Sequence, residues 1–542
     1  MSNVLPLVGN ANLTRTLITL LDSCKSMFEL RQIHAPVITF GLFQNDSFAS
    51  RILSFAATSD SGDMDYSCRV FLQLSNPTVF NWNTVIRGYS KSKKPNKAVS
   101  VFVEMLRVGF SPDHLTYPFL VKASAHLLDV RLAVAVHGHV VKSGYEFDRF
   151  VRNSLVHAYG TCGALVYACK VFDEMPNRNL VSWNAMLDAY AKFGDLSLAR
   201  EVFELMPERD VVSWSSLIDG YVKDGDYREA LAVFQQMQAL GSKANEVTMV
   251  SVLCACAHLG ALEQGRMMHH YMMENGLPLT LVLRTSLVDM YAKCGAIEEA
   301  LVVFRGVSGK QSDVLIWNAV IGGLATHGLV KESLDLYTEM QIMGIIPDEI
   351  TYLCLLCACA HGGLVKEAWY FFESLSKHGM TPKSEHYACL VDVLSRAGCL
   401  GQAYQFICQL PIEPTASMLG ALLNGCLNRG RLDLAEIVGK KLIELEPNHD
   451  GRYIGLSNVY AVVKRWDDAK TMRETMESRG VKKSPGCSFV EISRTLHRFI
   501  AHDKTHCQSK EIYMMLNSID RQMKLDANYE LEECCLYIVG NI

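Results

Sequence analysis

One local sequence context recurs around the tryptophans, and this repetition most constrains the fold. Four of the six tryptophans are each followed by a small polar residue and an apolar run: Trp82, Trp183, Trp214 and Trp317. Trp214 and Trp317 stand 103 residues apart, and the stretch LCACAH also occurs twice at that spacing, at 253–258 and 356–361. Both spacings divide into units of about 35, 35 and 31–33 residues, and periods of this length indicate a solenoid or array.

The unit 79–113 shows what one repeat folds into. Its first apolar residues fall at i, i+3, i+4 and i+7, which is one face of a helix: Trp82, Val85, Ile86 and Tyr89. Pro95 lies in the break before a second apolar stripe, and Gly109 ends that stripe. A helical hairpin of this kind cannot bury both faces alone, so it must stack on its neighbours.

The same pattern can be followed through most of the chain, which predicts an all-α solenoid of about twelve helix-turn-helix units. The expected units are 12–46, 47–78, 79–113, 114–148, 149–179, 180–210, 211–245, 246–280, 281–313, 314–348, 349–383 and 384–415.

The LCACAH stretches raise the question of a metal site. Cys254 and Cys256 are two positions apart, so on a helix they point to different faces and do not form a ligand pair. Unit 114–148 has Lys-Ala-Ser-Ala-His at the same place, which leaves the small residues as the shared requirement. We expect no metal, and we expect the three histidines at the ends of these stretches to be helix-end or packing residues: His126, His258 and His361.

Composition limits the remaining function classes. The 18 cysteines of this long chain fit buried free thiols in a reducing compartment better than a disulfide framework. The longest uncharged stretches contain Asn, His and paired Gly, so no membrane partner is expected. A net charge of −5 argues against a uniformly basic nucleic-acid surface, although a groove can be locally positive.

The alternation of unit lengths, the Trp-Asn pair in the first helix and the Pro-Asp pair at unit ends resemble the plant pentatricopeptide repeat family. The resemblance is to its PLS subfamily, in which long, short and standard repeats alternate, and to the E/E+ subgroup that lacks the DYW deaminase domain. It implies a right-handed α-solenoid that binds single-stranded organellar RNA. The organelle expected is the mitochondrion, with the chloroplast as the alternative.

The segment after Thr415 departs from the repeat pattern. It resembles the family's E-type extension over 416–492 and an E+-like extension over 493–525, which leaves a tail at 526–542. The first 25 residues contain one acid, Asp22, with Arg15, Lys25 and several Ser and Thr, a composition compatible with an organelle transit peptide, so the short segment 1–11 before the array is expected to be its remnant. Proteins with such extensions direct C-to-U editing of RNA. A zinc deaminase needs His-x-Glu and a later Cys-x-x-Cys, and only Cys354–Cys357, inside a repeat, has the second spacing. We therefore expect no enzyme activity, catalytic residues or cofactor, and a deaminase-bearing partner and other editing factors docked on the E-type region.

By the same resemblance, each unit reads one base with the residue after its first-helix aromatic and with its last residue. The implied pairs are Asn83 with Asp113 for U, Asn153 with Asn179 for a pyrimidine, Asn184 with Asp210 for U, Ser215 with Asn245 for A, Thr285 with Asp313 for G, and Asn318 with Asp348 for U. The long units carry Pro118, Val250 and Leu353 at the first position and should be unselective, and Ala388 with Thr415 gives no assignment. The implied core is 5′-U-n-Y-U-A-n-G-U-n-n, with the edited C downstream.

Four apolar residues near the starts of units are candidates for sandwiching the bases: Phe80, Val181, Val212 and Leu315. Packing at helix starts is the alternative for them, just as capping and turn formation is for the Asn and Asp residues. Two other functions stay open. The protein could stabilise or splice transcripts without editing, or it could be a protein-binding scaffold of the tetratricopeptide type.

Overall fold

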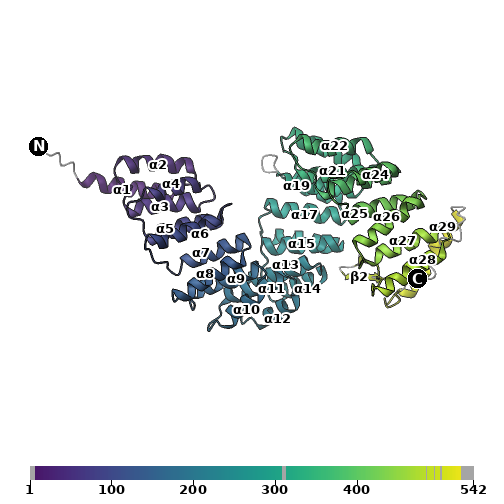
Figure 1. Cartoon of the computed structure of the whole chain (residues 1–542), viewed down its shortest axis with the longest axis horizontal. Helices are drawn as coiled ribbons and strands as arrows, with labels where there is room; N and C mark the ends of the chain where they lie inside the picture. Colours follow the sequence, from purple (N-terminus) through teal and green to yellow (C-terminus); the bar gives the residue numbers. More distant parts are fainter. Residues whose placement is uncertain (1–6, 308–312, 484, 493–494, 501–502, 527–542) are drawn as a thin grey trace. The chain divides into compact units, whose positions relative to one another are not determined.

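The computed structural model describes residues 7–307, 313–483, 485–492, 495–500 and 503–526. The chain forms two compact units, Met1–Thr248 and Met249–Ile542. Each is built from antiparallel helical pairs that follow one another along the chain (Figure 1).

In Met1–Thr248, successive helices alternate between a first and a second helix of each repeat. They are α1 (Leu7–Asp22), α2 (Met27–Thr39), α3 (Asp46–Thr58), α4 (Met64–Leu72), α5 (Val79–Lys91), α6 (Asn96–Arg107), α7 (Thr116–Leu127), α8 (Val130–Lys142), α9 (Arg149–Thr161), α10 (Leu165–Asp173), α11 (Leu180–Lys192), α12 (Leu196–Leu205), α13 (Val211–Asp224) and α14 (Tyr227–Ala239). The boundary between the two compact units falls inside α15 (Glu246–Leu259).

Local sequence explains where these helices begin and end. Helix α5 begins after Thr78, whose hydroxyl accepts from Asn81 N while the Asn81 side chain accepts from Thr78 N, a reciprocal capping box. Its partner α6 ends before Gly109, which has a φ of +88° that glycine tolerates best. The apolar faces of such pairs merge into one continuous core from Leu17 to Met186, as expected for hairpins that bury themselves on their neighbours.

Successive first helices approach one another at small residues. A Cβ on Gly160 of α9 would lie 2.5 Å from Ala189 Cβ of α11, closer than real Cβ atoms come. Gly220 of α13 stands in the same relation to Ala191, at 2.8 Å. The first helices therefore form the tightly packed layer of the array, which places their side chains in register from one repeat to the next.

The unit Met249–Ile542 continues the pattern. Its repeat helices are α16 (Leu262–Glu274), α17 (Leu281–Lys293), α18 (Ile297–Arg305), α19 (Val314–Thr326), α20 (Val330–Ile342), α21 (Glu349–Gly362), α22 (Val365–Lys377), α23 (Ser384–Arg396) and α24 (Leu400–Cys408). Two more hairpins follow, α25 (Ala416–Asn428) with α26 (Leu432–Leu445) and α27 (Asp450–Val462) with α28 (Trp466–Ser478). A second continuous core runs from Val391 to Met476 and joins these last hairpins to the repeats before them.

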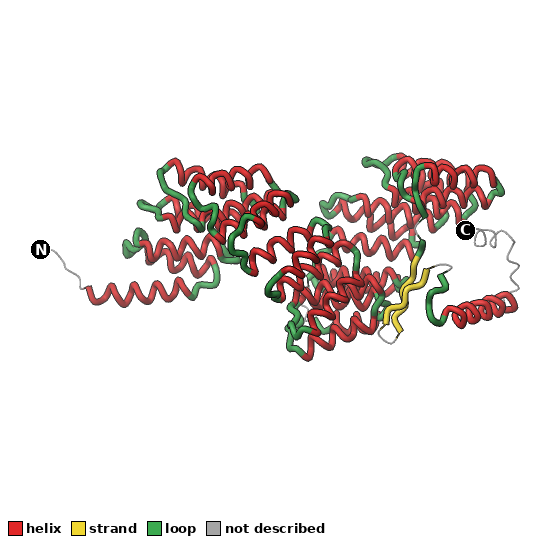
Figure 2. The backbone as a smooth tube through the Cα atoms, turned by 90° about the horizontal axis from the view of Figure 1, so that it is seen from below, coloured by secondary structure: helices red, strands yellow, loops and turns green. Residues whose placement is uncertain are grey.

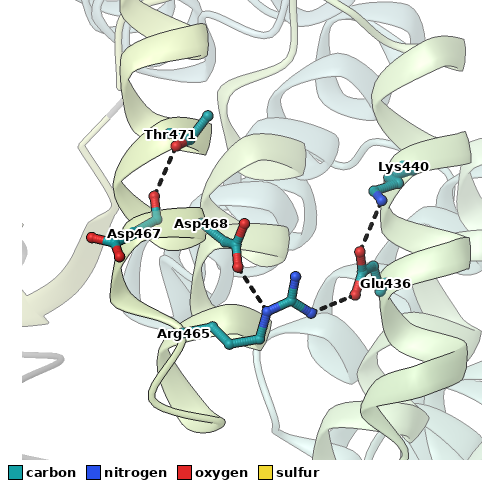
Figure 3. Close-up of polar contacts among 6 residues, drawn as sticks. All are labelled: Glu436, Lys440, Arg465, Asp467, Asp468 and Thr471. Carbon is teal, nitrogen blue, oxygen red and sulfur yellow. Dashed lines mark hydrogen bonds and ion pairs between the residues drawn. The ribbon is translucent and has the colours of Figure 1, made fainter.

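A charged network ties α26 to α28 (Figure 3). Arg465, just before α28, donates to Glu436 of α26 at 2.8 Å and to Asp468 at 2.7 Å, and its guanidinium lies 4.7 Å from the centre of the Tyr460 ring. Lys440 also contacts Glu436 at 2.8 Å. Hydrogen bonds from Lys440 and Arg465 lower the pKa of Glu436 to about 2, so this carboxylate stays ionised over the physiological range.

The only strands among the described residues are β1 (Cys487–Ile492) and β2 (Thr495–Ile500), an antiparallel pair drawn in yellow in Figure 2. Glu491 of β1 accepts from the backbone N–H groups of Glu263 and Gln264, at 2.7 and 3.1 Å. These groups open α16, whose N-cap Ala261 has no side chain able to cap them. A carboxylate far along the chain thus caps a repeat helix, and α29 (Ser509–Asp526) follows the strands.

The predicted fold class is confirmed: apart from the β1–β2 pair, the elements that the structure describes are helices, most of them in helix-turn-helix repeats. Helix α1 begins at Leu7, five residues before the expected start of the first unit at residue 12. Residues 1–6 of the expected N-terminal segment, and residues 527–542 of the expected tail, lie outside the described residues. No helix within the described ranges combines the length and apolar character needed to cross a membrane.

The tight contact between α9 and α11 yields a test. We expect Gly160→Ala to destabilise the packing of these helices by about 1–3 kcal/mol, because the added methyl group overlaps Ala189. Hydrogen exchange measured by mass spectrometry should then show faster exchange in α9 and α11. The matched control is Gly138→Ala in α8, where a Cβ would meet nothing within 4 Å and exchange should be unchanged or slower. Equal effects of the two substitutions would contradict the close-approach interpretation.

Candidate nucleic-acid interface

The two predicted reading residues of a repeat lie in hydrogen-bond contact. The amide of Asn83 donates to Asp113 at 2.9 Å. Three other amide pairs repeat this contact: Asn153 with Asn179 at 3.3 Å, Asn184 with Asp210 at 3.1 Å, and Asn318 with Asp348 at 2.9 Å. Ser215 lies 3.5 Å from Asn245. The last residue also accepts from backbone N–H groups at the start of the next first helix, so it caps that helix while it holds the amide.

A hydroxyl group that the sequence analysis did not single out completes each pair. It belongs to the third residue of the following repeat and lies 2.6–2.7 Å from the first reading residue: Thr116 to Asn83, Ser182 to Asn153, Ser213 to Asn184, Thr248 to Ser215, and Thr351 to Asn318. In the four amide cases the hydroxyl donates to Oδ1 while Nδ2 donates to the last residue. The orientation of the amide is therefore fixed, with one N–H and one oxygen lone pair left over. The sequence signal was the Asp/Asn-x-x-Ser/Thr spacing.

These hydrogen bonds also fix the charge of the last residue. Burial alone would raise the pKa of the Asp113 carboxyl, but hydrogen bonds from Asn83, Thr116 and the backbone outweigh it and hold the pKa below its usual range. The same balance lowers the pKa of Asp210, with Ser213 and Asn184 as donors. Both residues are thus carboxylates, which only accept hydrogen bonds, so the amide must turn its N–H toward them.

The reading residues lie on the floors of grooves. Asn184 lines a groove of about 400 Å³ together with Asn153, and Val181 and Val212 line its sides. In the other compact unit, Asn318 and Thr285 line a groove of about 590 Å³. Asn83, Asn153 and Asn318 expose only 6–9% of their surface. A ligand can therefore reach only a small part of these three residues, whereas Asn184 is half-buried.

The predicted sandwich residues remain accessible. Phe80, Val181, Val212 and Leu315 are 47–58% exposed, although each belongs to the first turn of a helix. The same second position is exposed in five further repeats that the sequence analysis did not single out: Leu115, Phe150, Val247, Val282 and Ile350. In the larger groove, Leu315 and Ile350 lie with Asn318. Exposed apolar side chains therefore alternate with the polar reading residues along the array, an arrangement that suits flat aromatic ligands.

The repeat 281–313 departs from this arrangement. Thr285 donates to the backbone oxygen of Leu281 at 2.9 Å, and Asp313 accepts from Leu315 N and Ile316 N. The third residue of the next repeat is Ile316, which has no hydroxyl. Among the described residues, no hydrogen bond joins Thr285 to Asp313, so the base assigned to this pair stays a prediction.

A row of cationic residues, also missed from the sequence, follows the reading positions. The residue eight positions after each reading residue is basic in five repeats: Lys91, Lys192, Lys223, Lys293 and Arg396. Four of these are held by an aspartate one turn earlier, as in Lys293–Asp289 at 2.9 Å and Arg396–Asp392 at 2.8 Å. Lys293 lines the larger groove with Thr285. The constant spacing of eight residues between the reading residue and the basic residue could have revealed this row in the sequence.

Three cations gather on α5 and α7: Arg87, Lys91 and Lys122. Burial, and then the charges of Lys91 and Arg87, lower the pKa of Lys122. Lys122 occupies the place that Cys254 and Cys357 take in the other long units. Three cations close enough to repel one another favour an anion between them.

The LCACAH stretches are part of the packing and of the groove. Cys256 and Cys359 are fully buried, together with the alanines beside them, whereas Cys254 and Cys357 line the larger groove. Within the described ranges, no group of three or more His, Cys, Asp or Glu side chains is placed to hold a metal ion.

Comparison with known proteins identifies the repeats. The PPR repeat family model matches 77–126, 209–258 and 312–361, and the PPR repeat model matches 150–180, 181–211, 282–309 and 350–380. The E motif model matches 430–491, from the end of α25 to β1. The family of the C-terminal region is thus the one that the sequence indicated, while the boundaries at 416, 493 and 526 stay predictions.

Similar proteins agree with these matches. A pentatricopeptide repeat-containing protein of Arabidopsis thaliana is 63% identical over 508 residues, covering 94% of this chain and 95% of the relative. A second from the same plant, named as chloroplastic, is 42% identical and covers 93% and 90%, and a third, named as mitochondrial, is 35% identical and covers 94% and 90%.

Among solved structures, the pentatricopeptide repeat protein PPR10 from maize matches with 17% identity and a TM-score of 0.39, covering 87% of this chain and 89% of that chain. A complex of PPR10 with an 18-nt psaJ RNA element matches with 17% identity and a TM-score of 0.36, covering 89% and 93%. On the sequence relatives and the repeat matches, this chain belongs to the pentatricopeptide repeat family and carries that family's E motif.

Proposed function

We propose that this protein binds single-stranded RNA of an organelle, one base per repeat, and selects a site for C-to-U editing. The observation that carries the RNA part is the fixed amide on the floor of each groove. Asn184 presents one N–H and one oxygen lone pair between the apolar walls of Val181 and Val212. A base inserted edge-first between those walls meets a donor and an acceptor that cannot exchange places.

Base identity would follow from the pairs along the array. The core expected is 5′-U-n-Y-U-A-n-G-U-n-n, with the unspecified bases at the long units and at the unit ending in Thr415. Pro118, Val250 and Leu353 of the long units offer no side-chain hydrogen bond to a base. These units would each hold one nucleotide of the RNA without selecting its base.

Affinity independent of sequence would come from the cationic row. The net charge of −5 disfavours RNA only if the charge is spread evenly, and the row places cations beside the reading positions. Arg87, Lys91 and Lys122 would neutralise phosphates where the strand crosses α5 and α7. The paired lysines, such as Lys293 with Asp289, would orient the RNA backbone but add little to the affinity, because an aspartate already balances their charge.

The C-terminal region would recruit the partner that carries out the deamination. Helix α29 exposes five large apolar side chains: Met514, Met515, Leu516, Ile519 and Met523, each 48–72% exposed. Large exposed apolar patches mark surfaces that bind other proteins, and methionine adapts to varied partners. The E motif favours an editing role, with catalysis supplied by a deaminase-bearing protein and no catalytic residue, metal or cofactor in this chain.

The compartment proposed is the mitochondrion, with the chloroplast as the alternative, since the similar plant proteins bear names of both kinds. Transcript stabilisation or splicing is the second candidate function, because the groove geometry serves any use of bound RNA. A tetratricopeptide-type scaffold would require peptide binding in the same groove.

A direct binding assay tests the proposal. Purified protein should bind a short RNA carrying the U-n-Y-U-A-n-G-U core more tightly than one with A and G exchanged at the positions of 211–245 and 281–313. Fluorescence anisotropy would give both dissociation constants at fixed salt. Equal binding of the two RNAs would contradict the base assignment, and failure to bind either would favour the scaffold alternative.

A single substitution should change one base preference. In Asn184→Thr the pair would become Thr with Asp210, the combination assigned to G in repeat 281–313. We expect the preferred base at this position to change from U to G, with a discrimination on the order of tenfold. RNAs that differ only at this base would measure it. The control Asn275→Thr, at the exposed end of α16, should keep the preference for U.

Loss of one cation should act on all sequences alike. We expect Lys122→Ala to weaken the core RNA and the exchanged RNA by the same factor. The slope of log affinity against log salt should fall by about 0.7 for the lost phosphate contact. Lys142→Ala, on the second helix α8, is the matched control and should leave both affinities and the slope unchanged. A change in base preference with Lys122→Ala would contradict a backbone role.

A further inference from the structure

Two thiols face each other across successive first helices. Cys357 of α21 and Cys389 of α23 have their sulfur atoms 3.6 Å apart, and both residues are partly buried. A disulfide requires about 2.05 Å between the sulfurs, so the atoms would have to approach by roughly 1.5 Å. Movement of this size needs only small side-chain rotations if the backbones are correctly spaced.

The backbone spacing at these two repeat positions can be compared with the preceding junction of the array. Cys357 and Cys389 occupy the ninth residue of one repeat and the sixth of the next, and one repeat earlier these places belong to Gly322 and Cys354. A Cβ on Gly322 would lie 3.8 Å from the Cβ of Cys354. Disulfides have Cβ separations of about 3.5–4.5 Å with a mean near 3.8 Å. This pair of positions is therefore spaced for a disulfide.

The two thiols are not equivalent. The two sulfurs share a hydrogen bond in which either can donate. That bond lowers the pKa of Cys357 and Arg396 lowers it further, against burial and the charge of Asp392. The same hydrogen bond raises the pKa of Cys389. Cys357 also lines the groove, where a peroxide can reach it. We therefore assign Cys357 as the nucleophile of the pair, since the thiolate is the reactive form.

The pair borders the proposed RNA site. Cys357 lines the 590 Å³ groove together with Asn318 and Thr285. A covalent link at this place would turn the Cys357 side chain toward α23, away from its present place in the groove lining, and would hold α21 and α23 at one spacing beside the last two repeats of the array.

We propose that Cys357 and Cys389 form a redox-modification site, oxidised by a peroxide to a disulfide and returned to two thiols by a dithiol reductant. The Cys357 thiolate attacks one peroxide oxygen, the O–O bond breaks, and hydroxide leaves, which gives a sulfenic acid. The Cys389 sulfur then attacks that sulfur and displaces the second oxygen, which leaves as water. Overall, two thiols and one hydrogen peroxide give one disulfide and two waters. Reduction oxidises the dithiol to its own disulfide.

The disulfide would weaken RNA binding, a consequence that rests on the proposed function. The reading side chains of neighbouring repeats must match the spacing of successive nucleotides, and the link would prevent α21 and α23 from adjusting that spacing to a bound strand. We expect a several-fold loss of affinity in the oxidised protein, restored by the dithiol.

Peptide mapping of the full-length protein tests the covalent step. After treatment with hydrogen peroxide and alkylation of free thiols, trypsin should release Glu332–Lys366 linked to Ser384–Arg396. The link should be absent from Cys357→Ser and Cys389→Ser. It should persist in Cys354→Ser, which removes a thiol from the same tryptic peptide, and in Cys408→Ser, which removes an exposed thiol on α24.

The Gly322→Cys variant is the positive control, because its thiol should pair with Cys354 at the equivalent junction. No link in the wild-type chain under peroxide that oxidises Cys408 would overturn the proposal, as would a link that survives Cys357→Ser. Anisotropy with the core RNA then separates the two claims. Unchanged affinity of the linked protein would overturn the coupling to RNA alone. No RNA binding by the reduced protein would overturn the proposed function and leave the disulfide result standing.

Discussion

Each helical hairpin of this protein is stable because the next hairpin covers it. The contact is closest between first helices, where Gly160 faces Ala189 and Gly220 faces Ala191 with no room for a larger side chain on the glycines. Such a stack has no central core, and its order passes from neighbour to neighbour. The close packing also fixes the register of the first helices, so that a polar residue at one position recurs at the base of successive grooves. The candidate interface is a consequence of how the stack is held together.

The hydrogen bonds that join the reading residues to the following repeat form only if the first helices keep this register. A hydroxyl from one repeat must reach the amide of the previous repeat at 2.6–2.7 Å, and a carboxylate or amide must cap a helix while it binds that same side chain. These groups would be costly to bury unpaired. Their mutual satisfaction explains why Asn can lie nearly buried in a site proposed to bind a ligand, with only its remaining donor and acceptor facing the groove.

Much of the fold followed from periodicity. The apolar spacing in 79–113 predicted helices around 82–89 and 98–105, and α5 and α6 enclose both ranges. Proximity of the reading pairs was expected only through the family resemblance, and the structure places four amide pairs in contact. The bases they select stay a prediction.

Other features could not be obtained from local patterns. The Glu491 cap on α16 joins residues 228 positions apart, and no periodic signal carries that contact. The Cys357–Cys389 approach depends on how two helices pack, which neither unit shows alone. The hydroxyl at the third position was available in the sequence as Asp/Asn-x-x-Ser/Thr, but that spacing also describes an ordinary helix cap.

The hydroxyl contact has a consequence for how such arrays evolve and can be rebuilt. The folding unit is a hairpin, and it ends where the next first helix begins. The recognition unit does not coincide with the hairpin. It runs from Asn83 to Thr116 in one case and from Asn318 to Thr351 in another. A recombination boundary placed between hairpins would separate each amide from the hydroxyl that orients it. A boundary placed after the third residue of the following repeat would transfer an intact recognition unit together with the residue that caps the next helix.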